Sequence, residues 1–206
     1  MSVATVPGHA AGLSEGIPPE PVVRLSVDDY HAMERAGILN EGAPVELLEG
    51  WLVQKMTKYP QHDVSLGCTA DAFEDLSDPK WHVRSQGAVM TSDSEPEPDV
   101  ALTRGRRRDF TQEHPGPDDI AIIVEIAESS LSRDRTWKKR IYAAAGFPVY
   151  WIVNLIDECV EVFESLSANT ATPDYASHRV FHRGDLIPVC VDGSDIGQVA
   201  VDELLS

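Results

Sequence analysis

The sequence of 206 residues has only three cysteines, Cys68, Cys159 and Cys190, and none of them forms a C-x-x-C pair. An odd number of cysteines without that spacing argues against a structural zinc site and against a disulfide framework. We therefore expect a reducing, cytoplasmic setting for the protein. In that setting the three thiols are expected to be buried as small apolar side chains.

Long hydrophobic runs are also absent. No apolar stretch is long enough to cross a membrane, so neither a membrane segment nor a membrane partner is expected. The first twenty residues have neither the positive start nor the apolar stretch of a secretory signal. They are rich in Pro, Gly and Ala, and we expect residues 1–22 to form a flexible arm before one folded domain at 23–206.

Positive charge is scarce. The chain has 17 Lys and Arg against 34 Asp and Glu, giving a formal net charge of -17 at pH 7. This balance argues against a general electrostatic attraction to nucleic acid. It does not exclude a local basic surface, and bound metal ions offset charge in an acidic pocket.

The most informative segment is IAIIVEIA at residues 120–127, an apolar run of strand length with Glu125 inside it. Such a run is typical of a strand that is covered on both faces. Burying an ionised carboxylate there is unfavourable unless a cation or hydrogen-bond donors contact it. Glu125 is therefore either neutral and hydrogen-bonded or placed beside a positive group.

The segments around this strand predict a mixed sheet. A helical pattern over 132–145 ends at Gly146, and a second buried strand follows at 149–153, which makes a βαβ unit with a parallel strand pair. Further helices are expected at 26–36 and 60–76, the second with Val64 on its buried side, and further strands at 45–48, 51–53, 81–90, 99–102, 159–163, 179–182 and 185–189. The fold class is therefore α/β or α+β around a mixed central sheet.

Helical geometry separates the basic residues of the 132–145 helix. At 100° per residue, Lys138 and Asp134 fall on the apolar face, whereas Lys139 and Arg140 fall outside it. Lys138 should therefore point toward the strand that contains Glu125. The simpler interpretation is an i,i+4 ion pair between Asp134 and Lys138.

Asp99 is the second acid of interest because it follows Pro98 at the start of a predicted strand. If that strand neighbours the 120–127 strand, Asp99 and Glu125 converge, and two carboxylates suit Mg²⁺. A single Asp at that place is otherwise a turn or strand-cap residue. Glu46, in a short apolar strand, is otherwise a solvent-facing hairpin residue.

Five motifs occur in a recognisable order. They are VELLEG at 45–50, EPDV at 97–100, VEIAESS at 124–130, D-x-x-x-K-x-x-x-Y at 134–142 and GFPVYWIV at 146–153. In this combination, over roughly residues 25–165, the chain resembles the Uma-type family of restriction endonucleases in the PD-(D/E)XK nuclease superfamily. The resemblance implies a restriction-endonuclease-like core of αβββαβ order over residues 23–206.

The resemblance also implies a divalent-metal site for DNA hydrolysis, with Mg²⁺ or Mn²⁺ held by Asp99 and Glu125. Glu46 would be a further catalytic acid and Lys138 the catalytic lysine. The superfamily lysine normally stands two residues after the glutamate, where this chain has Ala127. The following helix would supply it instead.

Two other matches to the family are weaker. His62 matches a histidine near the start of the second helix, for which a capping or exposed position is the simpler interpretation. Asn154 stands where the family often has Asp.

Two functions from different classes follow. The first is a Mg²⁺-dependent endonuclease acting on DNA, with Arg104, Arg106, Arg107 and Arg108 either contacting phosphates or forming a solvated loop. The second is a catalytically inactive nuclease-fold protein that acts as an interaction or regulatory module, which the acidity favours. A homodimer through Tyr150, Trp151 and Phe163 is an alternative to a core role for these aromatic residues.

Overall fold

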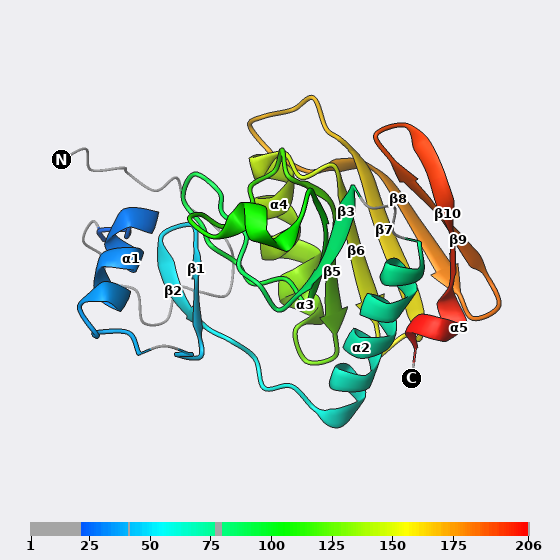
Figure 1. Cartoon of the computed structure of the whole chain (residues 1–206), viewed down its shortest axis with the longest axis horizontal. Helices are drawn as coiled ribbons and strands as arrows, with labels where there is room; N and C mark the ends of the chain where they lie inside the picture. The colour runs from blue at the N-terminus through cyan, green and yellow to red at the C-terminus, as the bar shows by residue number, and fades with distance from the viewer. Residues whose placement is uncertain (1–21, 41, 77–79, 206) are drawn as a thin grey trace.

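A six-stranded mixed sheet forms the centre of the protein, which the computed structural model describes over residues 22–40, 42–76 and 80–205 (Figure 1). Its strands follow the order β3–β4–β5–β6–β7–β8. They are β3 (Trp81–Ser85), β4 (Val100–Arg104), β5 (Ile120–Ala127), β6 (Val149–Asn154), β7 (Cys159–Leu166) and β8 (Tyr175–His182). In this sheet β5 and β6 run parallel, and the other neighbouring pairs are antiparallel. The expected βαβ unit is thus confirmed.

Helices cover both faces of this sheet. The described helices are α1 (Val27–Arg35), which lies apart from this sheet (Figure 1), α2 (Pro60–Asp75), α3 (Leu131–Arg133), α4 (Lys139–Ala145) and α5 (Val201–Leu204), with a 3-10 helix η1 (Arg107–Phe110) and a π-helical segment η2 (Asp134–Lys138). From α2 to β6 the elements follow the αβββαβ order when α3, η2 and α4 are taken as one helix. The mixed α and β fold class is therefore confirmed.

Strand β5 is buried along its whole length because two apolar cores flank it. Ile122 and Ile126 pack in the core that includes α2, whereas Ile123 and Ala127 pack in the core that includes α4. Side chains alternate between the two faces of a strand. Glu125, which lies between Ile123 and Ala127 on the same face, therefore points toward the helix that follows β5.

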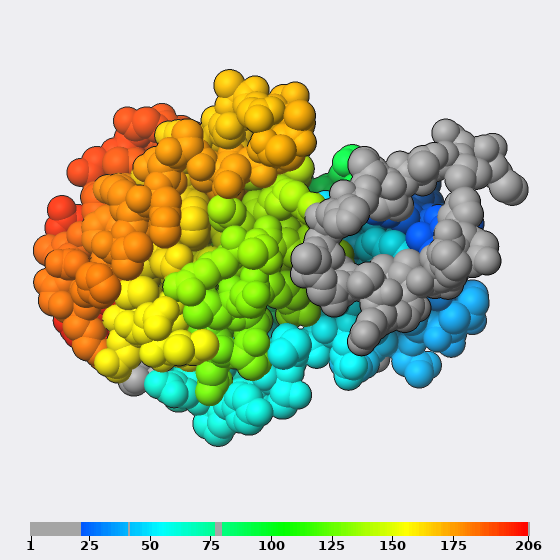
Figure 2. All heavy atoms as spheres, turned by 180° about the vertical axis from the view of Figure 1, so that it is seen from behind, coloured from blue at the N-terminus to red at the C-terminus, as the bar shows by residue number. Residues whose placement is uncertain are grey.

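Two small sheets lie at opposite ends of the molecule (Figures 1 and 2). At one end, β1 (Val45–Leu48) and β2 (Trp51–Gln54) form a hairpin beside α1, whose capping box at Ser26 and Asp29 is formed as expected. The hairpin joins the loop before β4 through a bond from Glu95 N to Leu47 O at 2.7 Å. At the other end, β9 (Leu186–Val191) pairs with β10 (Ser194–Ala200).

The buried face of α2 differs from the expected one. Val64, expected inside, is exposed. The buried residues are His62, Ser65, Thr69 and Phe73. Ser65 Oγ donates a hydrogen bond to Leu204 O of α5. The short polar side chain lets α5, which was not predicted, approach α2 closely.

Other expectations are corrected at single residues. Cys190 is exposed because it lies on an outward position of β9, whereas Cys159 is buried and Cys68 half-buried, all as free thiols. Tyr150 and Trp151 are fully buried in the two cores, so they offer no surface to a second copy. Residues 1–21 of the expected flexible arm lie outside the described residues. Among the described helices, none is long and apolar enough to span a bilayer.

Candidate active site

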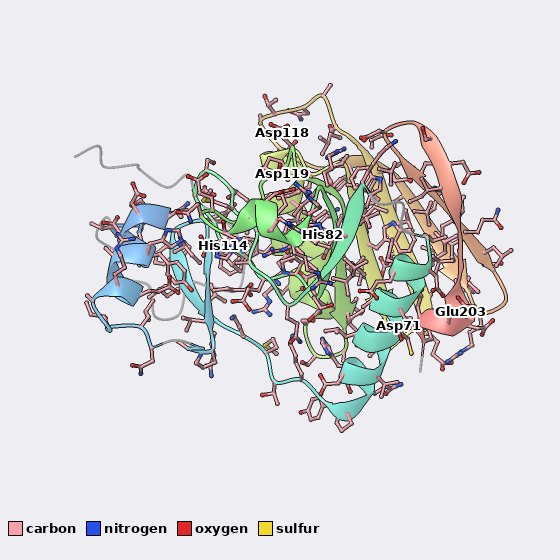
Figure 3. The ribbon with its side chains drawn as sticks, in the orientation of Figure 1. Asp71, His82, His114, Asp118, Asp119 and Glu203 are labelled. Carbon is pink, nitrogen blue, oxygen red and sulfur yellow. The ribbon has the colours of Figure 1, made fainter. Side chains whose placement is uncertain are left out.

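One pocket brings together the four residues that the sequence singled out, Glu46, Asp99, Glu125 and Lys138. The rest of its wall is formed by Lys55, Met56, Thr57, Lys58, His62, Glu97, Ile126, Glu128, Ser129, Ser130, Arg133 and Asp134. Other ionisable residues, labelled in Figure 3, come from elsewhere and do not line it: Asp71, His82, His114, Asp118, Asp119 and Glu203. The pocket is therefore the place where the predicted site residues converge.

Strand pairing explains why Asp99 lies beside Glu125. Val100 at the start of β4 pairs with Val124 of the antiparallel β5, so the residue before one strand adjoins the end of the other. Ile126 N donates a hydrogen bond to Asp99 Oδ2 at 2.9 Å. The expected proximity of the two strands is thus confirmed, and both acids are buried.

Asp99 is held in its charged form by two further residues. Lys58 Nζ lies 2.8 Å from Asp99 Oδ1, and His62 Nε2 lies 3.2 Å from Asp99 Oδ2. Burial alone raises the pKa of Asp99, but the hydrogen bonds and charges of His62 and Lys58 outweigh it and lower this pKa to about 2. Asp99 therefore presents a carboxylate at neutral pH.

Glu125 has the positive neighbour that its burial calls for. Lys138 Nζ donates to Glu125 Oε1 at 2.9 Å and lies 3.3 Å from Glu46 Oε2, while Tyr142 Oη donates to Glu125 Oε1 at 2.6 Å. The expectation that Lys138 points toward the strand is confirmed. Glu46 is buried and not solvent-facing. Lys138 thus joins an acid of the hairpin to an acid of the central sheet.

The π-helical segment η2 positions Lys138. Lys139 N donates to Asp134 O, five residues earlier, and such π-bulges widen one turn of a helix. Both Asp134 and Lys138 are buried, whereas Lys139 pairs with Asp174 on the partly exposed side. Asp134 and Lys138, at the two ends of this segment, both line the pocket.

Burial and charge act in opposite directions on the acid–lysine pair. Burial raises the pKa of Glu125 and Lys138 lowers it, while Asp134 and Asp99 raise it, so that the net pKa is about 8. Burial lowers the pKa of Lys138, but the carboxylates of Glu125, Glu46 and Asp134 outweigh this and raise it above its usual value. Lys138 therefore stays protonated, because three acids surround one ammonium group.

Asp134 is the least satisfied acid of the pocket. It is 1% exposed, and its carboxylate oxygens make no hydrogen bond of good geometry in the part of the chain that is described, although Ser130 lies close enough to lower its pKa. The i,i+4 ion pair with Lys138 is not formed within that part, since Lys138 Nζ contacts Glu125 and Glu46 instead. Burial raises the pKa of Asp134. The pocket thus holds an acid with oxygens free to accept.

Because Glu125 and Asp134 both have raised pKa values, the metal-free protein should lose stability as pH rises. The contribution of such an acid to stability is fully present below its pKa in the unfolded chain. It is lost as pH rises through the pKa of the acid in the folded protein, which is about 8 for Glu125. We expect Asp134→Asn to increase the free energy of unfolding by about 1–3 kcal/mol at pH ~9 and to change it little at pH ~3, below the ordinary pKa of an aspartate. Urea denaturation in EDTA measures both, and an equal gain at the two pH values would contradict this account.

Two residues of the site, Lys58 and His62, were not predicted to belong to it. The expectation that His62 is exposed or a cap is wrong, because it is buried against Asp99. The available signal was the spacing of His62, Ser65 and Thr69, a polar stripe at helical period that faces inward on α2. Lys58 lies on an irregular segment, for which no periodicity could indicate a direction.

The donor atoms suit a hard divalent cation. Asp99 and Glu125 offer carboxylate oxygens, Glu125 Oε2 makes no hydrogen bond among the described residues, and the Asp134 oxygens lack partners. Within residues 22–40, 42–76 and 80–205, no three His, Cys, Asp or Glu side chains form a complete metal site. Mg²⁺ needs no such cage, since it keeps several waters and uses one or two carboxylates with substrate phosphates. The residues therefore fit this ion.

The basic loop at 104–108 lies far from the pocket. Arg104 is at the opposite end of β4 from Asp99, about 17 Å along the strand at the usual rise. Arg104 pairs with Asp192, Arg106 with Asp109 and Arg107 with Glu74. These pairs favour the interpretation as a solvated surface loop over a contact with DNA at the pocket.

Comparisons with known proteins agree with this architecture. The model of a family called Uma2, described as "Putative restriction endonuclease", matches residues 27–194. A solved structure described as "a putative nuclease belonging to DUF820" from Anabaena variabilis is similar with a TM-score of 0.63 and 16% identity, covering 87% of this chain and 97% of that chain. At that identity the likeness concerns the fold alone. No curated protein matches the chain.

Proposed function

The chain belongs to the Uma2 family of restriction-endonuclease-like proteins, and from that premise we propose that it is a divalent-metal-dependent endonuclease that hydrolyses phosphodiester bonds of DNA. The observation that carries this proposal is the convergence of Asp99, Glu125 and Lys138 in one pocket. Two carboxylates and a protonated lysine form the set of charges that phosphodiester hydrolysis requires.

Five residues in or beside the pocket have roles in this proposal. Asp99 and Glu125 would hold Mg²⁺ or Mn²⁺, and this ion would supply Lewis-acid chemistry at the scissile phosphate and activation of the attacking water. Lys138 stabilises negative charge on the phosphate or orients the attacking water. Glu46 and Tyr142 are positioning residues, because Glu46 contacts Lys138 and Tyr142 donates to Glu125. Preorganised charges of this kind need no rearrangement as the reaction proceeds.

The test is cleavage of supercoiled plasmid by the full chain with Mg²⁺, with Mn²⁺ and with EDTA. We expect nicked and linear DNA to appear with either metal and to disappear with EDTA, because the carboxylates alone cannot activate water. Lys138→Met and its neighbour Lys139→Met, prepared side by side, exclude a contaminating nuclease. Absence of metal-dependent cleavage by the wild-type protein would favour the inactive, interaction-module function instead.

A further inference from the structure

The segment between β2 and α2 brings a second cation to the acidic pocket. Its residues Lys55, Met56, Thr57 and Lys58 all line the pocket. Lys58 Nζ lies 2.8 Å from Asp99 Oδ1, and its side chain is 37% exposed whereas that of Asp99 is 6% exposed. Lys58 thus reaches from the surface to a buried carboxylate that the proposed function assigns to a metal.

The two oxygens of Asp99 are held differently. Oδ2 accepts from Ile126 N of β5 and contacts His62 of α2, both of which are buried parts of regular elements. Oδ1 contacts Lys58. A divalent cation approaching Oδ1 therefore meets Lys58 first, and neither β5 nor α2 has to move to admit it.

Lys58 is also the lysine of the pocket that can leave its partner at small cost. When the pair opens, water solvates the exposed ammonium group of Lys58, and the incoming cation replaces it beside the buried Asp99 carboxylate. Lys138, by contrast, is buried between Glu125 and Glu46 and has no solvent to move into. The two lysines that contact Asp99 and Glu125 therefore differ in mobility: Lys138 is fixed, and Lys58 is displaceable.

The surroundings of Lys58 suit nucleic acid. Met56 and Tyr59, on the same segment, are 44% and 52% exposed, and Lys55 pairs with Glu97 at 2.6 Å. Exposed apolar and aromatic side chains between lysines provide contacts for bases and sugars as well as for phosphates. In a chain with a net charge of -17, this segment places positive charge next to the acids of the pocket.

We propose that Lys58 is a resident counter-ion of Asp99 that a divalent cation displaces, and that the released ammonium group then contacts a DNA phosphate at the mouth of the pocket. This inference rests on the proposed function. Lys58 should therefore weaken metal binding and strengthen DNA binding. A lysine with a purely structural role would not have these two opposite effects.

The first experiment measures Mn²⁺ binding to the full-length protein by titration calorimetry. Lys58→Met is expected to bind Mn²⁺ about two- to fivefold more tightly than wild type, because the competing pair with Asp99 is removed. Lys55→Met, on the same segment but paired with Glu97, is expected to bind Mn²⁺ as wild type does. Unchanged or weaker Mn²⁺ binding by Lys58→Met overturns the displacement.

The second experiment measures binding of a labelled DNA duplex in Ca²⁺ over a range of salt concentrations. Lys58→Met is expected to weaken binding several-fold and to reduce the slope of log K against log salt by about 0.9, the change for one lost phosphate contact. An unchanged affinity and slope overturn the phosphate contact. If Asp99→Asn binds Mn²⁺ as well as wild type does, the metal site itself fails, and both the proposed function and this inference fail with it. Binding that depends on Asp99 but not on Lys58 overturns this inference alone.

Discussion

Replacing Lys138 with methionine is expected to reduce DNA cleavage by at least about 100-fold and to lower the free energy of unfolding by about 3–5 kcal/mol. The stability loss follows because Lys138 is 3% exposed and its Nζ contacts both Glu125 and Glu46. Methionine fills similar space but leaves Glu125 without its lysine and leaves Glu46 with Arg133, 3.7 Å away, as its remaining cation among the described residues. Plasmid cleavage and urea denaturation measure the two effects.

The two effects of Lys138→Met can be separated. Adding Glu125→Gln to Lys138→Met removes an unpaired acid, and we expect stability to recover partly while cleavage stays absent. The matched control is Lys139→Met, since Lys139 is the adjacent residue and pairs with Asp174 near the surface. It should cost at most about 1 kcal/mol and leave cleavage near the wild-type rate. Cleavage by Lys138→Met at the rate of Lys139→Met would remove Lys138 from the proposed mechanism.

The second large effect is expected for Asp99→Asn. The amide keeps the size of the side chain and accepts the bond from Ile126 N, but its NH₂ group then faces the Lys58 ammonium. We expect cleavage to be lost, Mn²⁺ affinity to fall more than about tenfold and stability to fall by about 1–3 kcal/mol. Calorimetric titration with Mn²⁺ separates the loss of the metal from the loss of stability.

The pH dependence of stability provides an independent check on Asp99. Its pKa of about 2 lies below the ordinary value, so its contribution is present at neutral pH and is lost as pH falls toward 2. The Asp99→Asn variant should therefore lose less stability on acidification than the wild type. The control is Asp192→Asn, whose carboxylate pairs with Arg104 at the other end of β4 and should leave Mn²⁺ affinity unchanged. If both variants bind Mn²⁺ equally well, Asp99 is not a ligand.

The sequence predicted those parts of the molecule that local periodicity determines. The apolar run around Glu125 and the helical period around Lys138 are local patterns, and each gave both the element and the direction of the side chain. The meeting of Asp99 with Glu125 followed once β4 and β5 were taken as neighbours. The order of motifs added the family, which the match over residues 27–194 shows.

The other features of the site depend on tertiary contacts between distant segments. Local sequence patterns therefore did not predict them. Lys58 reaches Asp99 from an irregular segment 41 positions away in the chain, so no period relates the two residues. His62 is buried because the polar stripe of α2 faces the interior. The apolar residues of this helix had predicted a different buried face. The bond from Lys139 N to Asp134 O departs from the ideal α-helix, and a helical wheel does not represent that departure.

The contact of Lys138 with both Glu46 and Glu125 has a consequence for how the protein matures. Glu46 belongs to the β1–β2 hairpin and Glu125 to the central sheet, which are separate sheets. A chain whose hairpin has not yet docked holds only part of the pocket. Under the proposed function, a partly folded molecule would lack Glu46 beside Lys138, so full cleavage activity would require the docked hairpin.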